Sequence, residues 1–192
     1  MTFLTQRDRA QQLFELADAQ AGYFTAHQAL DLGYAYPTQH HHQRVGHWQR
    51  AGHGLYRLTA YPITEHEQLA QLTLWSRTRA GETQAVVSHD TALSLHGVSD
   101  LLPEQLHLTV PCGFRKPAPV GVVLHVGTLR PEEVETRHGF SMTTLERTLL
   151  DLAEEGRHVD LLEQAIEVAA AQGAIGQATA GRLKGMTRGD QR

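Results

Sequence analysis

The sequence contains a single cysteine, Cys112, so no disulfide can form within the chain. It also lacks any apolar run that approaches the roughly 18 residues of a membrane-spanning helix. Arg7, Asp8 and Arg9 interrupt the apolar segment that a secretory signal peptide requires. We therefore expect a cytoplasmic protein in a reducing environment, with no membrane partner.

An excess of positive charge is also missing, because the chain carries a formal net charge of −4. Residues 1–62 contain five Arg and four acidic residues, whereas the remainder contains twelve Lys or Arg and seventeen acidic residues. Proteins that bind nucleic acid usually present a basic face. Any such face must therefore be local, although six of the thirteen histidines lie in residues 1–62 and can add charge at mildly acid pH.

Patterns typical of catalysis are absent as well. Ser88, His89 and Asp90 are neighbours in sequence, and we expect their side chains to point apart rather than to form a catalytic triad. Cys112 has no evident activating base near it in the sequence. The glycines do not form a phosphate-binding loop. We therefore expect no enzymatic activity and no cofactor.

The N-terminal histidines do not have the spacing of metal ligands on a helix. Two such ligands should lie three or four residues apart. This separation is absent from the set His40, His41, His42, His47 and His53. We therefore predict no metal site.

Residues 1–62 have the order of elements that is typical of a winged helix-turn-helix. Apolar residues from Ala10 to Ala17 recur at helical spacing. Thr25 and Gln28 form a capping box for a second helix, which we expect to stop at Gly33. Pro37 suits the first turn of a third helix, and the alternating residues 55–58 predict a strand of the wing.

The third helix, which we expect over Gln39–Arg50, carries side chains suited to a major groove. Val45 and Trp48 can pack inward, whereas Gln, Arg and His side chains on the opposite face can pair with base edges or phosphates. Solvated helices of protein-docking modules share this polarity, so a protein-interaction module is the alternative. The predicted DNA-binding residues are Gln39, His40, Gln43, Arg44, His47, Arg50, His53 and Arg57.

Beyond Pro62 the chain has the pattern of a mixed α/β domain over residues 63–175. We expect strands at residues 85–87, 106–110 and 122–126, and helices at 88–95 and from Thr143 onward. Residues 106–110 alternate as in a sheet with one wetter face. The overall fold class is therefore α+β, with a weakly ordered tail at residues 176–192.

Two features of this second domain could serve a partner. Arg147 and Asp151 lie four residues apart, so they can pair on one helix and either support it or face another protein. The helix at residues 159–171 has a broad apolar face, which must be covered by the sheet of its own domain or by another protein.

Several of these residues resemble a known family, the AbiE-type (AbiEi-like) antitoxins of type IV toxin–antitoxin systems. The resemblance implies a DNA-binding autorepressor whose second domain opposes a nucleotidyltransferase-like toxin encoded alongside it. Whether two copies assemble on double-stranded operator DNA stays open. The matching residues are Gly22-Tyr23-Phe24-Thr25-Ala26, Gln28-Ala29, Gly33-Tyr34, Gly46, Trp48, Arg50 and Gly54-Leu55-Tyr56-Arg57-Leu58, and more weakly residues 88–93, 107–111 and 144–151.

Overall fold

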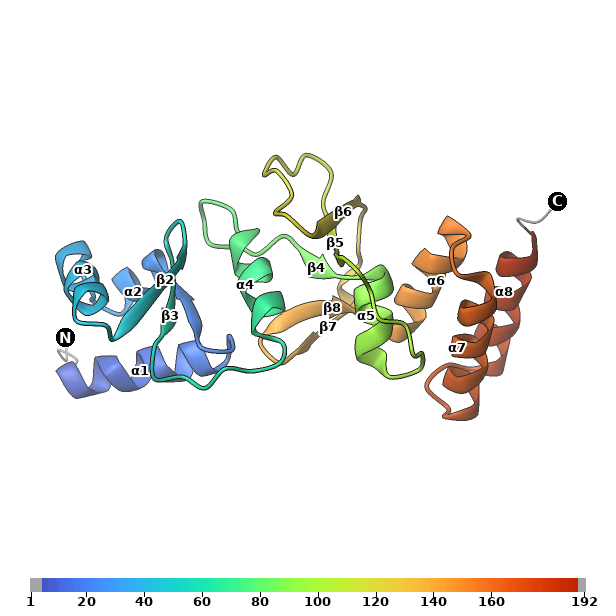
Figure 1. The fold of residues 1–192 in the computed structure, drawn as a ribbon, viewed down its shortest axis with the longest axis horizontal. Coiled ribbons are helices and arrows are strands. Elements are labelled where there is room, and N and C mark those ends of the chain that lie inside the picture. The colour runs from blue at the N-terminus through green and yellow to red at the C-terminus, as the bar shows by residue number, and fades with distance from the viewer. Residues whose placement is uncertain (1–4, 190–192) are drawn as a thin grey trace. The chain divides into compact units, whose positions relative to one another are not determined.

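The computed structural model describes residues 5–189 of the chain (Figure 1). Its internal contacts divide it into two compact units, one of Met1–Gln84 with Thr136–Phe140 and the other of Ala85–Glu135 with Ser141–Arg192. Both units combine helices with a β-sheet, which confirms the predicted α+β class. Within residues 5–189, no helix has the length and apolar character needed to cross a bilayer.

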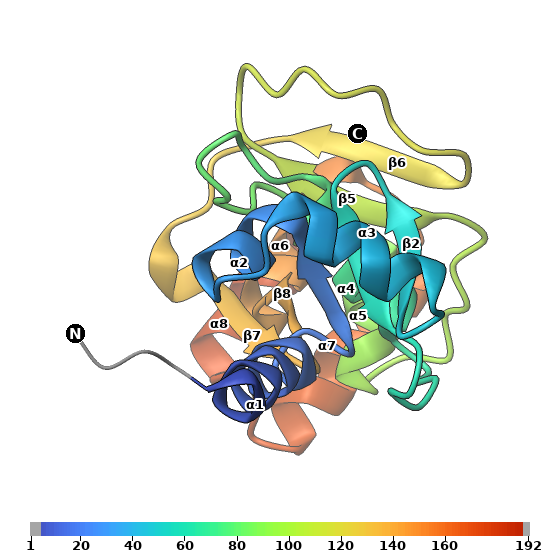
Figure 2. The same cartoon turned by 90° about the vertical axis from the view of Figure 1, so that its left-hand side faces the viewer.

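The N-terminal unit is a winged helix-turn-helix. Its strands form one antiparallel sheet in the order β1-β3-β2, and a core of Leu13, Phe24, Tyr34 and Trp48 lies between the sheet and the helices. Figure 2 shows α2 and α3 side by side, with β2 next to α3. The elements are α1 (Gln6–Asp18), β1 (Tyr23–Thr25), α2 (Ala26–Asp31), α3 (Tyr36–Arg44), β2 (Trp48–Gly52), β3 (Leu55–Leu58) and α4 (Glu67–Trp75).

Two capping boxes set where α1 and α2 begin. The hydroxyl of Thr5 accepts from the amide of Asp8, and the carboxylate of Asp8 accepts from the amide of Thr5. Thr25 and Gln28 make the same reciprocal pair at α2. Each box satisfies backbone N–H groups that have no partner inside the helix, and the predicted start of α2 at Thr25 is thereby confirmed.

Helix α3 is shorter than predicted, because it ends at Arg44 rather than at Arg50. Gly46 follows with a φ of 80°, a left-handed conformation that stops the helix, and Trp48 then begins β2. The change of element also reverses the expectation for Val45, which is 46% exposed instead of buried. Residues 48–52 therefore belong to the wing, which we define as the β2–β3 hairpin.

The N-terminal unit extends beyond the boundary that we expected near Pro62, because α4 holds the wing. The amide of Gln71 donates to the carbonyl oxygen of Ala51 at 2.9 Å. Arg77 Nη2, just after α4, donates to the carbonyl oxygens of His53 and Gly54, both at 2.8 Å. These contacts place residues 63–84 with the winged helix-turn-helix rather than with the second domain.

A second sheet has the strand order β6-β5-β4-β8-β7, and it belongs to the C-terminal unit except for Thr136–Phe140 of the β7–β8 hairpin. Strands β5 and β6 run parallel, whereas β4 and β5 run antiparallel. The three predicted strands are confirmed, but the last two, at the other edge, were not expected. The elements up to the sheet's end are β4 (Val86–Val87), α5 (His89–His96), β5 (Leu106–Val110), β6 (Val122–Val126), η1 (Pro131–Glu133), β7 (Val134–Arg137) and β8 (Phe140–Thr143).

Three further helices close this unit, namely α6 (Leu145–Glu155), α7 (Val159–Ala171) and α8 (Gln177–Gly189), which pack on one another (Figure 1). The apolar face of α7 is buried by this packing, since Ala165 and Ile166 are 0% exposed. Neighbouring helices, not the sheet or a partner, thus supply its cover.

The segment 177–189 is a helix, so the predicted weakly ordered tail is wrong there; residues 190–192 of that prediction lie outside the described part. Ala180, Leu183 and Thr187 share one face of α8 and are buried. Packing of this face against α6 and α7 stabilises a segment whose glycines disfavour a helix in isolation.

Truncation of Leu183 tests this assignment. Because Leu183 is 0% exposed in the core, Leu183→Ala should lower the free energy of unfolding by about 2–5 kcal/mol, measured by urea denaturation. The control Arg182→Ala on the same helix removes only an exposed ion pair with Glu146 and should cost less than about 1 kcal/mol. Equal, small effects of the two changes would show that α8 is not packed.

Candidate nucleic-acid interface

Gln39 holds α3 in place and does not face solvent. Its side chain is 1% exposed, and its amide nitrogen donates to the carbonyl oxygens of Ala26 at 3.0 Å and Tyr34 at 2.8 Å. The predicted role of Gln39 in reading bases is therefore wrong. A buried amide is retained here because it donates to two backbone carbonyls, one at the start of α2 and one just before α3.

The other predicted residues of α3 are more exposed than Gln39. His40 and Arg44 are exposed, and Gln43 is partly exposed. His47, in the turn after α3, is exposed as well. We call these four residues the recognition face.

An aromatic stack beneath the recognition face fixes the position of the turn after α3. The ring of His42 stacks on Trp48 with centroids 4.7 Å apart and planes 11° apart. Its Nδ1 lies 3.2 Å from Nδ1 of His47. Burial lowers the pKa of His42, and the neighbouring His47 and His41 lower it further. A neutral His42 can thus form a hydrogen bond that orients His47.

Two of the predicted residues lie on the wing. Arg50 on β2 is exposed, and its Nε donates to the carbonyl oxygen of Gly52 at 3.3 Å. His53 is exposed in the turn between β2 and β3, where Arg77 binds its backbone. The long side chain of Arg50 thus has one end directed by the wing backbone.

Arg57 lies on the opposite face of β3, so its predicted contact with DNA is wrong. It is 8% exposed, and its Nη2 lies 3.1 Å from Oε2 of Glu67 and donates to the carbonyl oxygen of Tyr61 at 3.0 Å. Leu55 is buried at 2% exposure, and residues two apart on a strand share a face. Arg57 is therefore a structural residue that joins the wing to α4.

Arg147 and Asp151, which we suggested could face a partner, instead make their contacts within the C-terminal unit. Arg147 Nε donates to Oδ1 of Asp151 at 2.7 Å, and its Nη1 donates to Oε2 of Glu133 at 3.1 Å. The Asp151 side chain is 6% exposed, and burial raises its pKa to about 6 although Arg147 opposes the shift. The pair links α6 to η1, which corrects the suggestion that it faces a partner.

The segment Ser88-His89-Asp90 also differs from expectation. His89 has a φ of 50°, which turns its ring back so that Nδ1 lies 2.9 Å from the hydroxyl of Ser88. Neighbouring side chains therefore do meet here. Ser88 is 0% exposed, however, and Asp90 faces His107 instead, so the three do not form an accessible triad.

Sequence reasoning missed a simple signal for the interface, which is the absence of acidic residues. Asp and Glu do not occur anywhere from Leu32 to Thr64, a segment that spans α3 and the wing. His41 and Gln49 were not predicted either, and both are exposed in this segment. The local charge is therefore positive even though the whole chain is acidic.

Two family models match this chain, one within the N-terminal unit and the other almost wholly within the C-terminal unit. Residues 11–59 match the family model described as "Transcriptional regulator, AbiEi antitoxin". Residues 84–184 match the model described as "AbiEi antitoxin C-terminal domain", which covers more than half of the chain. The chain belongs to the AbiEi antitoxin family. Regulation and antitoxin activity, rather than catalysis, are the functions that these AbiEi descriptions name.

Other comparisons add less about this AbiEi protein. No curated protein matches it. It is similar to a solved structure described as the crystal structure of RV2827C protein from Mycobacterium tuberculosis, with 13% identity and a TM-score of 0.49. The match covers 93% of this chain and 76% of that chain. A likeness at this level carries no information about function.

Replacement of Gln39 distinguishes its structural role from base recognition. Gln39→Ala leaves the carbonyls of Ala26 and Tyr34 without their donor and should destabilise the protein by about 1–3 kcal/mol in urea denaturation. Gln43→Ala, on the partly exposed side of α3, should change stability by less than about 0.5 kcal/mol. An unchanged stability of Gln39→Ala would contradict this assignment.

Proposed function

We propose that this AbiEi protein is a transcriptional autorepressor that binds double-stranded operator DNA through α3 and the wing. The main support is the acid-free segment from Leu32 to Thr64, which presents Arg44 and Arg50 beside exposed histidines. Electrostatic attraction to phosphates supplies most of the affinity of such domains, and an acidic residue in the contact would oppose it.

The side chains of the recognition face have the chemistry needed to distinguish base pairs. Arg44 can pair with both major-groove acceptors of a guanine, and Gln43 can pair with an adenine in the same manner. His40 and His47 flank these residues and can reach bases or phosphates. We therefore assign base recognition to the recognition face. Three of its four residues lie on α3, and the buried Gln39 fixes the rotation of that helix about its axis.

The wing residues Arg50 and His53 would contact the DNA backbone. Arg50 can neutralise one phosphate from β2, and His53 at the turn can approach the adjacent strand. Because few positively charged side chains would contact the phosphates, we expect a single N-terminal unit to bind DNA with modest affinity. Two copies on adjacent half-sites would bind more tightly, and the spacing of the operator repeats would reveal this arrangement.

A binding assay with the DNA upstream of the protein's own gene tests the proposal. Arg44→Ala should cost about 1–3 kcal/mol of binding free energy and reduce the preference for this sequence over a scrambled one. Arg50→Ala should weaken binding to both sequences alike and reduce the slope of log K against log salt by about one. Electrophoretic retardation at several salt concentrations measures both effects.

The matched control is Arg182→Ala, which removes an exposed arginine from α8 in the other unit. It should bind DNA as the unmodified protein does. Binding that is insensitive to salt, or equal losses from Arg182→Ala and Arg44→Ala, would contradict the proposed interface.

We further propose that the C-terminal unit opposes a nucleotidyltransferase-type toxin encoded next to this gene. The support is the match of residues 84–184 to the antitoxin C-terminal domain. Coexpression with that toxin should restore growth of cells that the toxin alone arrests. Arg44→Ala should still restore growth if the two functions lie in separate units. Failure of the unmodified chain to restore growth would contradict the antitoxin proposal and favour a regulator without a toxin partner.

The alternative of a protein-interaction module without DNA binding has lost one of its supports. The weak positive charge of residues 1–62 and the polar face of the third helix still allow it, but the apolar face of α7 is covered by α6 and α8 within the same unit. Within the described residues, the α7 side chains that stay exposed include only one large hydrophobic residue, Val168, at 39% exposure.

A further inference from the structure

Three histidines from separate elements meet in the C-terminal unit, and we call them the histidine cluster. His89 is the first residue of α5, His107 lies on β5 and His125 on β6. The rings of His89 and His125 stack with centroids 3.5 Å apart, and those of His107 and His125 lie 5.1 Å apart. Residues 106–110 were expected to have a wetter face, but His107 and Thr109 are each only 4% exposed.

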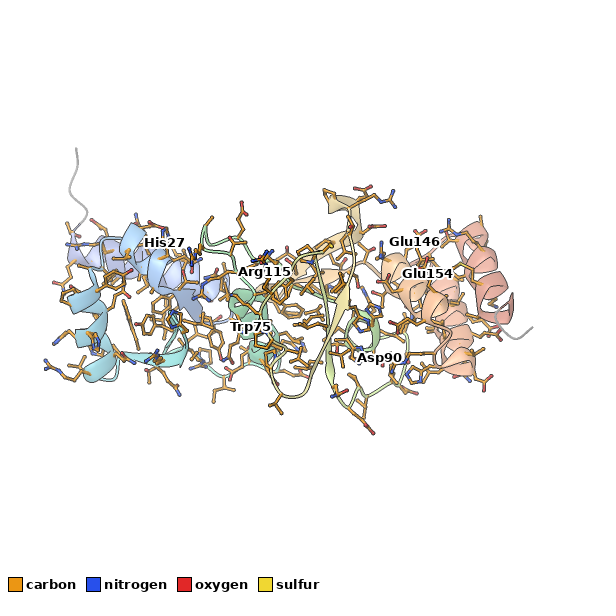
Figure 3. All side chains as sticks on the ribbon, turned by 90° about the horizontal axis from the view of Figure 1, so that it is seen from above. His27, Trp75, Asp90, Arg115, Glu146 and Glu154 are labelled. Carbon is orange, nitrogen blue, oxygen red and sulfur yellow. The ribbon has the colours of Figure 1, made fainter. Side chains whose placement is uncertain are left out.

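Two carboxylates complete this group. Glu155, at the end of α6, places Oε1 3.0 Å from His125 Nδ1 and 3.4 Å from His89 Nε2. Asp90 lies next to His89 on α5 and is labelled in Figure 3; its Oδ2 is 3.6 Å from His107 Nε2. Two imidazole nitrogens and a carboxylate oxygen therefore converge on one point from different elements.

The spacing of these three donor atoms fits a transition-metal ion. One donor each from His89, His125 and Glu155 lies within 4.8 Å of the others. Ligands at about 2.0–2.1 Å from a tetrahedral zinc ion lie about 3.3 Å from one another. The distances from Glu155 Oε1 to the two histidines, 3.0 and 3.4 Å, are already close to that value.

The outer nitrogen atoms of the two histidines have the partners that metal-bound histidines need. His125 Nε2 lies 2.9 Å from His107 Nδ1, and His107 Nε2 faces Asp90. With one proton on His125 Nε2 and one on His107 Nε2, a chain of polar contacts runs from His125 through His107 to the carboxylate of Asp90. Such partners fix the orientation of a ligating ring and raise its basicity.

His89 is oriented at a cost in backbone energy. Its φ of 50° lies in the left-handed region that only a few per cent of non-glycine residues adopt, although histidine, asparagine and aspartate tolerate it better than most. In this conformation Nδ1 meets the hydroxyl of Ser88, which also accepts from Thr109, and Nε2 is left facing Glu155. Strained residues of this kind concentrate at binding and catalytic sites.

We propose that His89, His125 and Glu155 form a binding site for a divalent transition-metal ion such as Zn²⁺. Three protein ligands leave one coordination position for water or for an atom of a partner. The side chains of Glu155 and His125 are 30% and 17% exposed, so the site lies near the surface of its unit. Two imidazole ligands select zinc or a similar ion over Mg²⁺ or Ca²⁺, which prefer oxygen.

Positive groups beside the site do not occupy the proposed ligand atoms. Arg157 Nη2 binds Oδ2 of Asp90 at 3.1 Å, and its Nη1 lies 3.5 Å from Oε2 of Glu155, the other oxygen of that carboxylate. His158 Nε2 lies 3.5 Å from the same Asp90 oxygen. Oε1 of Glu155 thus remains directed at the two histidines.

Binding of Zn²⁺ or Co²⁺ to the full chain tests the site, after treatment with a chelator and dialysis. We expect one equivalent by calorimetry, a higher thermal unfolding midpoint, and the visible absorption of tetrahedral Co²⁺. His89→Asn should lower the affinity at least about a hundredfold and still fold, because asparagine tolerates a positive φ. Glu155→Gln should have a similar effect, and His107→Gln should lower affinity about 10–100-fold.

The control is His47→Gln, because His42 and His47 form a second close pair of imidazoles in the N-terminal unit. It should bind Zn²⁺ with unchanged affinity, and Mg²⁺ should not compete. The proposal is overturned if the unmodified chain takes up no Zn²⁺ or Co²⁺ at 100-fold excess over protein. It is also overturned if His89→Asn and Glu155→Gln bind as the unmodified chain does.

Discussion

The burial of one side of α3 is the constraint on which the interface depends. The Gln39 amide donates to the carbonyl oxygens of Ala26 at the start of α2 and Tyr34 before α3, and the His42 ring stacks on Trp48 in the core. Together these contacts fix the rotation of a helix of only nine residues. Such a helix would not be stable by itself, so its packing decides which side chains reach solvent. Arg44 points outward as a consequence.

The arginines of the N-terminal unit have two distinct roles, which their place on the wing determines. Arg50 lies on β2 with an exposed side chain, whereas Arg57 lies on the buried face of β3 and pairs with Glu67. Removal of one partner of a buried ion pair strongly destabilises a protein, because the remaining buried charge then has no opposite charge beside it. Counting basic residues in the sequence therefore overestimates the charge available to DNA, and the lack of acidic residues is the better indicator.

Local signals in the sequence were sufficient for much of the fold. Thr25 and Gln28 cap α2 through contacts three residues apart, and the alternation of residues 106–110 identified β5. The end of α3 was missed because the helical spacing of Val45 and Trp48 outweighed Gly46 in our prediction. Because residues two apart on a strand share a face, the sequence already implied that Arg57 lies on the same face as the apolar Leu55, and our prediction overlooked this.

Features that depend on tertiary contacts could not be predicted in the same way. Leu183 stabilises α8 only because α6 and α7 lie against it, and the local sequence is poor in apolar residues. The donors His89, His125 and Glu155 are far apart in sequence and come from a helix start, a strand and a helix end. A search for ligands at helical spacing examines one element at a time, so it cannot find this group.

The central claim is that the exposed side of α3, together with the wing, contacts operator DNA. Mapping of backbone amide NMR shifts on addition of the upstream DNA fragment measures this contact residue by residue. We predict the largest changes at His40, Arg44 and His47 and in the β2–β3 turn, with small changes in α6–α8. Changes confined to the C-terminal unit, or none at all under low salt, would contradict the account.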